Sequence, residues 1–476
     1  MSKYKSLGAA KNDGISSFGA YCEGCLEKQR LIDEMREYIT SLQARLNYRD
    51  RKDTQPFFGS STPSSNLPFK ENTLEENRLK KGGSKPGHKG NGRKRIVKSD
   101  ADRIVRKPVE EKSCPSCGGD LEHKDTLFRG VIDCFLNKAE KLLYECEVKR
   151  CVKCNKTFSN KPPVLPRNKY GNNLICNSTI MHYFHGIPLK RLEKLWGENV
   201  IQGNLMKSFH RLAKLWKPTM EKLKKEYRQH PVKGADETGW RTDGKSGYAW
   251  LFATDDISIY ALRDTRSSRV AKEVLGTRKL PGVLVVDRYG VYNKSPCVLQ
   301  YCYAHLLRDL EDLGKEFPDE KEVERFVSSL APLLANAMHL RTQPVSNKEY
   351  YRQAKSLKRK ITKVARAPAE HSGIQSFQNI LRKNEHRLYH WVSSRRVPAD
   401  NNRVERELRP TVIARKVSFG SQSENGANTR SILMSILHTA AKRLKNKSLE
   451  EWFLWTLEEF TKNPNVNPTS LLPTSK

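Results

Sequence analysis

The spacing of hydrophobic positions changes twice along the chain. Between residues 232 and 303 the apolar positions alternate with polar ones or form short apolar runs, which predicts strands. The clearest run, Val283–Val286, follows the turn residues Pro281 and Gly282 and predicts a strand buried on both faces. On either side of this region the apolar positions have helical spacing. We therefore expect strands at 232–236, 247–254, 257–263, 283–287 and 298–303, and helices at 268–276 and 304–316.

This order of elements indicates the fold class. Three consecutive strands followed by alternating helices and strands are typical of a ribonuclease-H-like α/β core. Residues 316–396 have only helical spacing and many Lys and Arg residues, which predicts an all-helical insertion that interrupts the core. The expected division is a first core part at 231–315, the insertion at 316–396, a second core part at 397–447, and a C-terminal helix and tail at 448–476.

Smaller units precede the core. The first unit is residues 1–50, in which residues 22–48 predict a helix with an a/d seam. Both a dimerising zipper and a helix packed on its own domain agree with this pattern. Residues 51–107 predict a flexible basic linker, because Pro, Ser, Gly and basic residues dominate. Residues 161–230 predict helices, of which the pair around Gly197 is either a DNA-binding helix-turn-helix or two helices that only pack together. The seam positions are Ile32, Met35, Ile39, Leu42 and Leu46.

The net charge predicts a class of partner. The chain of 476 residues carries a formal charge of +34 and has a pI near 9.7. Such an excess of basic residues favours a polyanion, either nucleic acid or an acidic membrane surface. The sequence contains no apolar run of the roughly 18 residues needed to cross a bilayer, and its start lacks the apolar core of a signal peptide. We therefore expect a soluble, cytoplasmic protein that binds DNA or RNA.

The linker holds the first candidates for DNA contact. Every charged residue between Arg78 and Lys98 is basic, and the glycines and proline keep this segment from forming a core. An extended basic segment can follow phosphates or lie in a minor groove, while a solvated linker is the alternative. The candidate side chains are Lys85, Lys89, Arg93, Lys94 and Arg95.

Two C-x-x-C pairs predict a structural zinc site in a module at residues 108–160. Four thiolates from two such pairs can surround one Zn²⁺, and eleven cysteines suit a reducing compartment better than disulfides. The 33 residues between the pairs exceed the common spacing of a zinc ribbon, and residues 128–149 within them predict strands. A third pair, Cys22 and Cys25, cannot complete a tetrahedral site alone. The expected zinc ligands are Cys114, Cys117, Cys151 and Cys154.

Three carboxylates occur where such a fold presents chemistry. Asp236 lies on the first predicted strand, Asp287 ends the fourth, and Glu405 lies on a helix that begins after Pro398. Because the first and fourth strands are neighbours in a ribonuclease-H-like sheet, we expect both aspartates at the same edge. Carboxylates that hold two Mg²⁺ ions are suited to cleaving and joining phosphodiesters. Glu237 is expected on the face of the strand opposite to Asp236, and Glu407 on a different side of the helix from Glu405. Spacing alone does not decide which member of each pair faces the active site.

Arginines surround the third carboxylate. Arg403, Arg406 and Arg409 can bind phosphates on the same helix as Glu405, and Arg409 lies one turn after it. The alternative is an exposed helix with ordinary surface ion pairs.

Four short motifs occur in this part of the chain: Gly-Ala-Asp-Glu-Thr at 234–238, Val-Asp-Arg-Tyr-Gly-Val-Tyr at 286–292, Cys-Tyr-Ala-His at 302–305 and Asn-Asn-Arg-Val-Glu-Arg at 401–406. Together they resemble the motifs of the transposases of the insertion sequence 66 family, a bacterial group with Asp-Asp-Glu chemistry. One departure is Arg288, where the family usually has Gly after the second Asp, and another is Gly239, where Pro is usual. The cysteine pairs and the N-terminal helix also resemble the family's zinc-finger domain and leucine-zipper-like start.

The resemblance implies a function and its parts. It implies that Asp236, Asp287 and Glu405 bind Mg²⁺, for which Mn²⁺ can substitute, and catalyse strand cleavage and strand transfer at terminal inverted repeats. It also implies a protein of the bacterial cytoplasm that associates with the nucleoid. There it is expected to bind the double-stranded DNA of the element ends and of the target as a homodimer or higher oligomer, with or without accessory proteins of the element. His305 is expected either to support the active site or to satisfy a buried hydrogen bond. Two other functions stay open: a catalytically silent zinc-containing regulator that binds DNA, and a nuclease without strand transfer.

Overall fold

The computed structural model describes residues 164–166, 168, 170–197 and 200–475, part of one N-terminal helix between residues 27 and 39, Ser99, and the backbone of two short strands. These two strands, β1 (Val148–Arg150) and β2 (Thr157–Ser159), pair antiparallel around the stretch that contains the second C-x-x-C pair. All four predicted zinc ligands and the five basic residues of the linker lie outside the described residues. The zinc module and the basic arm therefore stay predictions.

A five-stranded mixed sheet forms the centre of the molecule. Its order is β5-β4-β3-β6-β7, in which β3, β4 and β5 are antiparallel and β3, β6 and β7 are parallel. This topology is consistent with the predicted ribonuclease-H-like core. The strands are β3 (Val232–Thr242), β4 (Lys245–Ala253), β5 (Ser258–Arg263), β6 (Val283–Val286) and β7 (Val298–Tyr301), and the helices α6 (Ser268–Leu275) and α7 (Tyr303–Glu316) follow β5 and β7.

The first strand is longer than its predicted span of 232–236. It continues to Thr242 because a tight turn at Asp243 and Gly244 returns the chain directly into β4, with φ angles of 54° and 71°. Both residues have the left-handed conformation that a type I′ hairpin requires, and Asp-Gly is a common sequence for that turn. The Asp-Gly pair is therefore a signal in the sequence that the predicted strand boundaries did not use.

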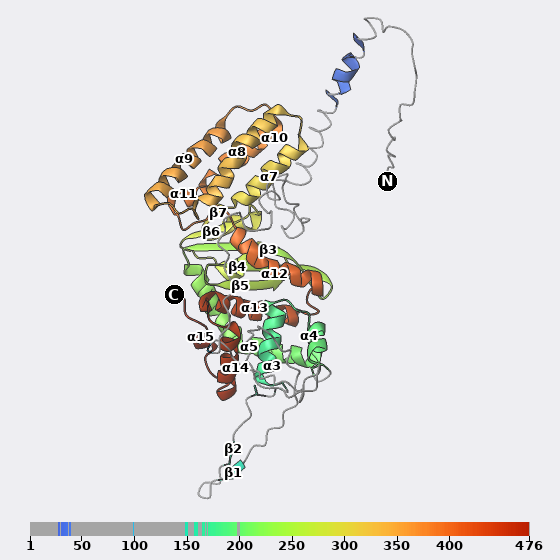
Figure 1. Cartoon of the computed structure of the whole chain (residues 1–476), viewed down its shortest axis with the longest axis vertical. Helices are drawn as coiled ribbons and strands as arrows, with labels where there is room; N and C mark the ends of the chain where they lie inside the picture. Colours follow the sequence, from blue (N-terminus) through green and yellow to red (C-terminus); the bar gives the residue numbers. More distant parts are fainter. Residues whose placement is uncertain are drawn as a thin grey trace, which may run out of the picture.

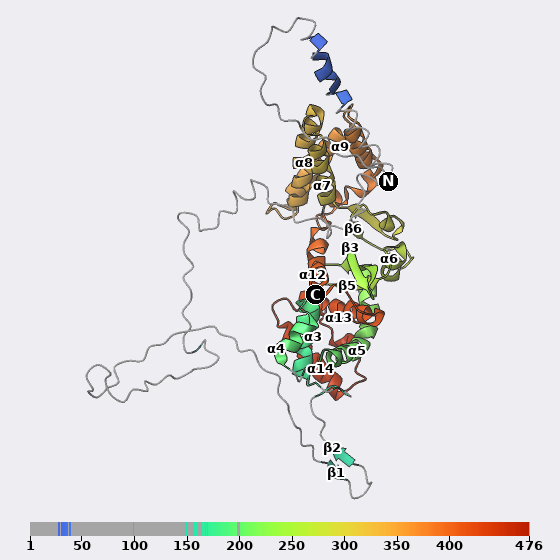
Figure 2. The ribbon, with the colours of Figure 1, turned by 90° about the vertical axis from the view of Figure 1, so that its right-hand side faces the viewer.

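A helical insertion separates the two parts of the core. Its helices are α8 (Lys321–Leu340), α9 (Asn347–Arg366), α10 (Ser372–Lys383) and α11 (His390–Ser393), and no strand occurs among residues 317–401 of the described chain. The chain then returns to the sheet through α12 (Asn402–Ser418). In Figures 1 and 2, α12 lies between the insertion and the helices at the other end of the molecule.

The helices on the far side of α12 form the other end of the molecule. The second helix of the predicted pair around Gly197 is α5 (Gln202–Gln229), which packs on α13 (Glu424–Leu444) and buries its own Leu205, Phe209 and Leu212. The remaining helices are α3 (Asn172–Thr179), α4 (Leu189–Trp196), α14 (Leu449–Lys462) and α15 (Pro468–Leu471). No helix within the described ranges is both long and apolar enough to span a membrane.

Side chains of α13 accept hydrogen bonds from the backbone at the free edge of β5. Hydroxyl groups four residues apart accept hydrogen bonds from alternate backbone N–H groups of the strand, at 2.8–3.0 Å. An open sheet edge is a site for unwanted strand pairing, so this helix both covers the edge and uses its donors. The donors are Ser258, Tyr260 and Leu262, and the acceptors are Thr439, Ser435 and Ser431 in the same order.

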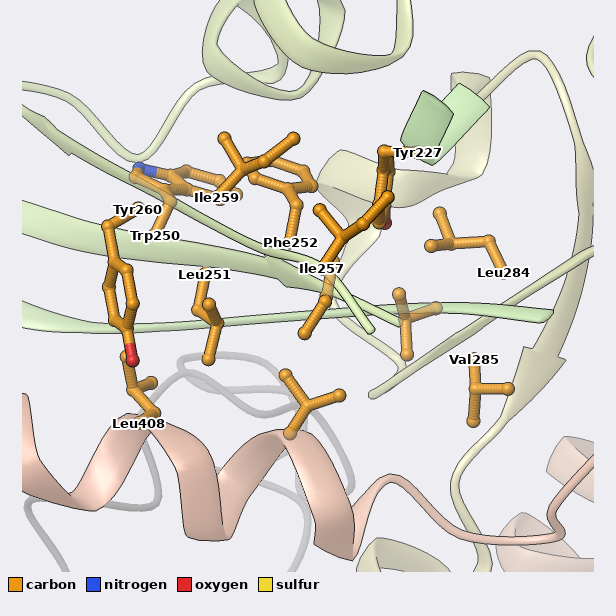
Figure 3. Packing of buried hydrophobic residues seen from close by; sticks show 14 of the residues in the cluster. Tyr227, Trp250, Leu251, Phe252, Ile257, Ile259, Tyr260, Leu284, Val285 and Leu408 are labelled. Atoms are coloured by element: carbon orange, nitrogen blue, oxygen red, sulfur yellow. The ribbon is translucent and has the colours of Figure 1, made fainter. Parts of the chain in front are cut away.

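The hydrophobic core lies on both faces of the sheet. Figure 3 shows Leu251 and Tyr260 on the face toward Leu408 of α12, while Trp250 and Phe252 point to the opposite face. All five side chains are at most 3% exposed. Alternation along β4 and β5 therefore gives the sheet two apolar faces, and α12 covers one of them.

Candidate active site

Strand register brings the two aspartates to the same edge of the sheet. Gly234 of β3 pairs with Val285 of β6 in the parallel ladder, and Asp236 and Asp287 each lie two residues further along. Equivalent positions on adjacent strands are about 5 Å apart and point to the same side. The structure therefore brings Asp236 and Asp287 together at the carboxyl end of β6, as the predicted strand order required.

Close packing of α12 on β3 positions the third carboxylate. The amide of Asn401, just before the helix, donates to the backbone oxygen of Ala235 at 2.9 Å. Gly234 has no side chain at the point of contact, and a Cβ built there would lie 2.5 Å from Cγ2 of Val404. The helix therefore approaches the strand at a glycine, which fixes the next helical residue, Glu405, beside the sheet edge.

The charges of the three carboxylates interact. The pKa of Asp236 is raised well above its usual value, first by burial and then by the negative charges of Glu237, Glu405 and Asp287. The pKa of Glu405 is also raised by burial, and Asp287 adds to this effect. Carboxylates that raise each other's pKa lie close together in a medium of low dielectric. Asp236, Asp287 and Glu405 thus form one electrostatic cluster.

The neighbouring glutamates belong to other interactions. Glu237 points to the other face of the sheet, where its carboxylate accepts from Arg266 at 2.6 Å and from the hydroxyl of Tyr292 at 2.6 Å. Glu407 pairs with Lys442 at 2.8 Å and accepts a hydrogen bond from Ser258. Each of these carboxylates therefore already has a cationic partner, Arg266 for Glu237 and Lys442 for Glu407.

Helix α7 supplies basic groups beside Glu405. Arg308 donates to Glu405 at 3.1 Å, and Nδ1 of His305 lies 3.6 Å from the same carboxylate. Burial, followed by the charges of Arg308 and Arg288, lowers the pKa of His305 to about 3, so the imidazole is neutral near pH 7. Sequence reasoning missed Arg308, although its place three residues after His305 puts both on one helical face.

Two motif residues have structural partners. Cys302 is buried before α7, and its sulfur accepts a hydrogen bond from the backbone N–H of Asn401 at 3.1 Å. Arg288, which stands in place of the usual Gly, forms an ion pair with Asp309 of α7. These contacts join α7 to the end of β6, next to Asp287, and to the start of α12, which carries Glu405.

The donor set agrees with a hard divalent cation. Oδ1 of Asp236 accepts from the backbone N–H of Glu237 at 2.9 Å, but its Oδ2 is buried and has no hydrogen-bond partner among the described residues. A buried carboxylate oxygen without a partner is costly unless a cation compensates it. Clustered carboxylate oxygens are the preferred ligands of Mg²⁺ and Mn²⁺.

A second cluster is less suited to a cation. His230, Asp255 and Asp256 bring possible ligand atoms within 4.8 Å of one another, at the end of α5 and the turn after β4. His230 lies 2.8 Å from Asp255, and Asp256 is 3.5 Å from Arg443 and accepts hydrogen bonds from Thr254 and Ser475. These carboxylates already have partners, in contrast to the Oδ2 atom of Asp236.

The predicted phosphate-binding arginines of α12 are accessible. Arg403, Arg406 and Arg409 are all exposed, while Val404 and Leu408 between them are buried against the sheet. The helix therefore presents basic groups to solvent and its apolar side to the core, with Glu405 at the boundary.

Two kinds of comparison relate this chain to known proteins. Two curated relatives are uncharacterized proteins of Sinorhizobium fredii (strain NBRC 101917 / NGR234): y4jD is 26% identical over 301 residues, and y4qI is 24% identical over 345 residues. The matches cover 56% and 63% of this chain, and 58% and 61% of the relatives, so the chain spans about three fifths of their length. The sequence pattern of the family described as "Transposase IS66 family" matches residues 167–429, which is more than half of the chain. The protein therefore belongs to the IS66 family of transposases.

Proposed function

We propose that this chain is a DNA transposase that cleaves the strands at the ends of its insertion sequence and joins them to a target. One observation carries the proposal: Asp236 and Asp287 are buried at one edge of the sheet, the half-buried Glu405 lies close enough to raise the pKa of Asp236, and Oδ2 of Asp236 has no protein partner among the described residues. Such a cluster is unfavourable in itself and becomes favourable when divalent cations neutralise it.

Each residue of the cluster has a distinct role in the proposed reaction. Asp236 and Asp287 would hold the two cations from the sheet, and Glu405 would complete the site from α12. When bound, the cations would supply Lewis acidity for the phosphate and lower the pKa of the attacking water. Arg308 orients Glu405 through its hydrogen bond at 3.1 Å, and its charge opposes the rise in the pKa of that carboxyl.

The proposed reaction has two steps, hydrolysis at the element end and strand transfer to the target. In the first, water attacks the phosphorus at the element end, the bond from phosphorus to O3′ breaks, and a 3′-hydroxyl is released. In the second, a 3′-hydroxyl attacks a phosphorus of the target, and the displaced O3′ leaves with a proton. The exposed Arg403, Arg406 and Arg409 would bind backbone phosphates during both steps.

The proposal extends to the N-terminal part of the chain. We expect Zn²⁺ at Cys114, Cys117, Cys151 and Cys154, and DNA contacts from the basic arm around Lys85 and Arg95. These units would recognise the element ends, and the charge of +34 suits an assembly in which several chains share two DNA duplexes. Metal analysis of the purified protein tests the zinc site, with one Zn²⁺ per chain expected.

A strand-transfer assay tests the function. The purified chain is incubated with Mg²⁺, a labelled duplex that carries the terminal inverted repeat of its own element, and a circular target. Joined product is expected from the natural protein, and Asp287→Asn should lose cutting and joining while it still binds the duplex. Cut ends without joined product would favour a nuclease, and binding without cutting by the natural protein would favour a regulator.

A further inference from the structure

A row of basic residues follows one side of α9 in the helical insertion. Successive members are three or four residues apart, so they share one face of the helix, and the last lies 18 positions after the first. At 1.5 Å per residue the row is about 27 Å long. We call this surface the α9 basic face, and its members are Lys348, Arg352, Lys355, Arg359, Lys363 and Arg366.

Packing fixes the direction in which the α9 basic face points. The opposite side of the helix carries Tyr350, Ala354, Ile361 and Ala365, which are at most 4% exposed and pack against α8, α10 and α11. All six basic residues are exposed. The helix cannot rotate without burying charge, so the basic row remains directed to solvent.

Little negative charge balances this surface. Glu349 is the one acidic residue in α9, and it pairs with Arg352 at 2.6 Å. Arg366 lies 3.4 Å from Glu385 at the other end of the row. The remaining four members form no ion pair with any residue that the structure describes. The centre of the row is therefore a region of uncompensated positive charge.

The composition of the face selects one kind of partner. None of the large hydrophobic residues exposed in the described chain belongs to α9. A helix that binds a membrane surface needs apolar residues that insert between lipids, and most protein interfaces have an apolar centre. A long row of Lys and Arg without apolar residues is instead complementary to a regular array of phosphates. At about 3.4 Å per base pair, its length corresponds to about eight base pairs of duplex.

The insertion also holds the α9 basic face in a fixed relation to the catalytic helix. Arg395, in the segment that leads to α12, donates to the backbone oxygens of Val345 and Gln343 at 2.7 and 2.8 Å, just before α9 begins. In the other direction, α8 packs on both α7 and α9, and Figure 1 shows it between them. The basic row is thus separated from His305 and Arg308 of α7 by one intervening helix.

We propose that the α9 basic face is a second binding site for duplex DNA, separate from the strand that is cut, and that it contacts phosphates without reading base sequence. This inference rests on the proposed function for the presence of DNA, but not on the catalytic assignment. The helical insertion would then hold a further stretch of duplex at a fixed position from the active site.

A triple substitution tests the site. Lys355→Gln, Arg359→Gln and Lys363→Gln are combined in the full-length Asp287→Asn protein, and a control protein combines Lys321→Gln, Arg325→Gln and Lys383→Gln. The control residues are exposed on α8 and α10, and Glu322 and Glu324 lie between the two that are on α8. Both triples remove the same charge and keep good helix formers. Binding of a labelled duplex of about 30 base pairs is followed by fluorescence anisotropy between about 50 and 200 mM KCl, without added Mg²⁺.

The salt dependence distinguishes phosphate contact from a general effect of charge. If all three residues contact phosphates, the slope of log K against log salt should become shallower by about 2.7 in the α9 triple. The control should change it little, and an element end and an unrelated duplex should lose equal affinity from the α9 triple. Equal effects of both triples, an unchanged slope, or a loss confined to the element end would overturn the inference. Because binding is measured without catalysis, a failure of the proposed active site would leave this result intact.

Discussion

Replacing Gly234 with alanine perturbs the contact on which the position of Glu405 depends. The new Cβ would lie 2.5 Å from Cγ2 of Val404 and 3.0 Å from Oδ1 of Asn401. Carbon atoms pack at about 3.5–4.0 Å, so α12 or the Val404 side chain must yield by about 1 Å. Valine has one strongly preferred rotamer in a helix, which directs most of this displacement to the helix itself.

The displacement predicts effects on both stability and rate. Overpacking of this kind costs about 1–3 kcal/mol of the free energy of unfolding. A shift of about 1 Å in a catalytic group lowers the rate by about 100-fold, because the reacting groups lose alignment. We therefore expect Gly234→Ala to fold with a lower denaturation midpoint and to cut an end-bearing duplex about 100-fold more slowly, with unchanged DNA affinity.

Two further variants test the role of the contact between Gly234 and Val404. Gly203→Ala, at a position in α5 where a Cβ meets nothing within 4 Å, should leave the cutting rate unchanged. Val404→Ala removes the clashing methyl group, so the Gly234→Ala/Val404→Ala double variant should cut faster than Gly234→Ala alone. Single-turnover cleavage and urea unfolding measure both quantities. A normal cutting rate in Gly234→Ala, or no recovery in the double variant, would refute the proposed role of this contact.

Three other contacts lead to further predictions. Glu405→Gln should abolish cutting in a gel assay while Glu407→Gln retains it, because Glu407 pairs with Lys442 away from the cluster; the opposite pattern would reverse the assignment. Burial lowers the pKa of His438 from 6.5 to about 3. Below pH 6.5 the unfolded chain therefore binds a proton at this residue while the folded chain does not, so the free energy of unfolding falls as the pH decreases toward 3. At about pH 5 this loss is about 2 kcal/mol. His438→Phe should accordingly reduce the acid sensitivity of urea unfolding by about that amount, and an unchanged pH dependence would contradict this. Ser435→Ala should cost about 1–3 kcal/mol in the same assay, because the buried N–H of Tyr260 loses its acceptor, and a neutral result would show that the edge of β5 finds another partner.

Hydrophobic spacing is sufficient to predict the order of the core elements. The apolar run Val283–Val286 is β6, and Asp287 follows it directly, at the edge where it meets Asp236. These relations depend on chain order and side-chain alternation, which are local properties of the sequence. The same alternation separates Asp236 from Glu237, which lie on opposite faces of β3.

Contacts between distant segments are not predictable in the same way. Spacing does not decide between Glu405 and Glu407, since that choice depends on which face of α12 meets the sheet. The deciding feature is the approach of Val404 to Gly234, which are 170 positions apart in the sequence. The ion pair between Arg308 and Glu405 and the hydroxyl groups of α13 that bind β5 are likewise products of tertiary packing.

The most direct test of the central claim is to locate divalent cations in crystals of the protein bound to an element-end duplex and soaked in Mn²⁺. Anomalous scattering identifies Mn²⁺ without regard to the surrounding protein. Peaks bounded by the carboxylates of Asp236, Asp287 and Glu405 are predicted, and they should disappear in Asp287→Asn. A peak only at His230, Asp255 and Asp256, or none at the three proposed ligands in a complex that cuts DNA, would contradict the proposed active site.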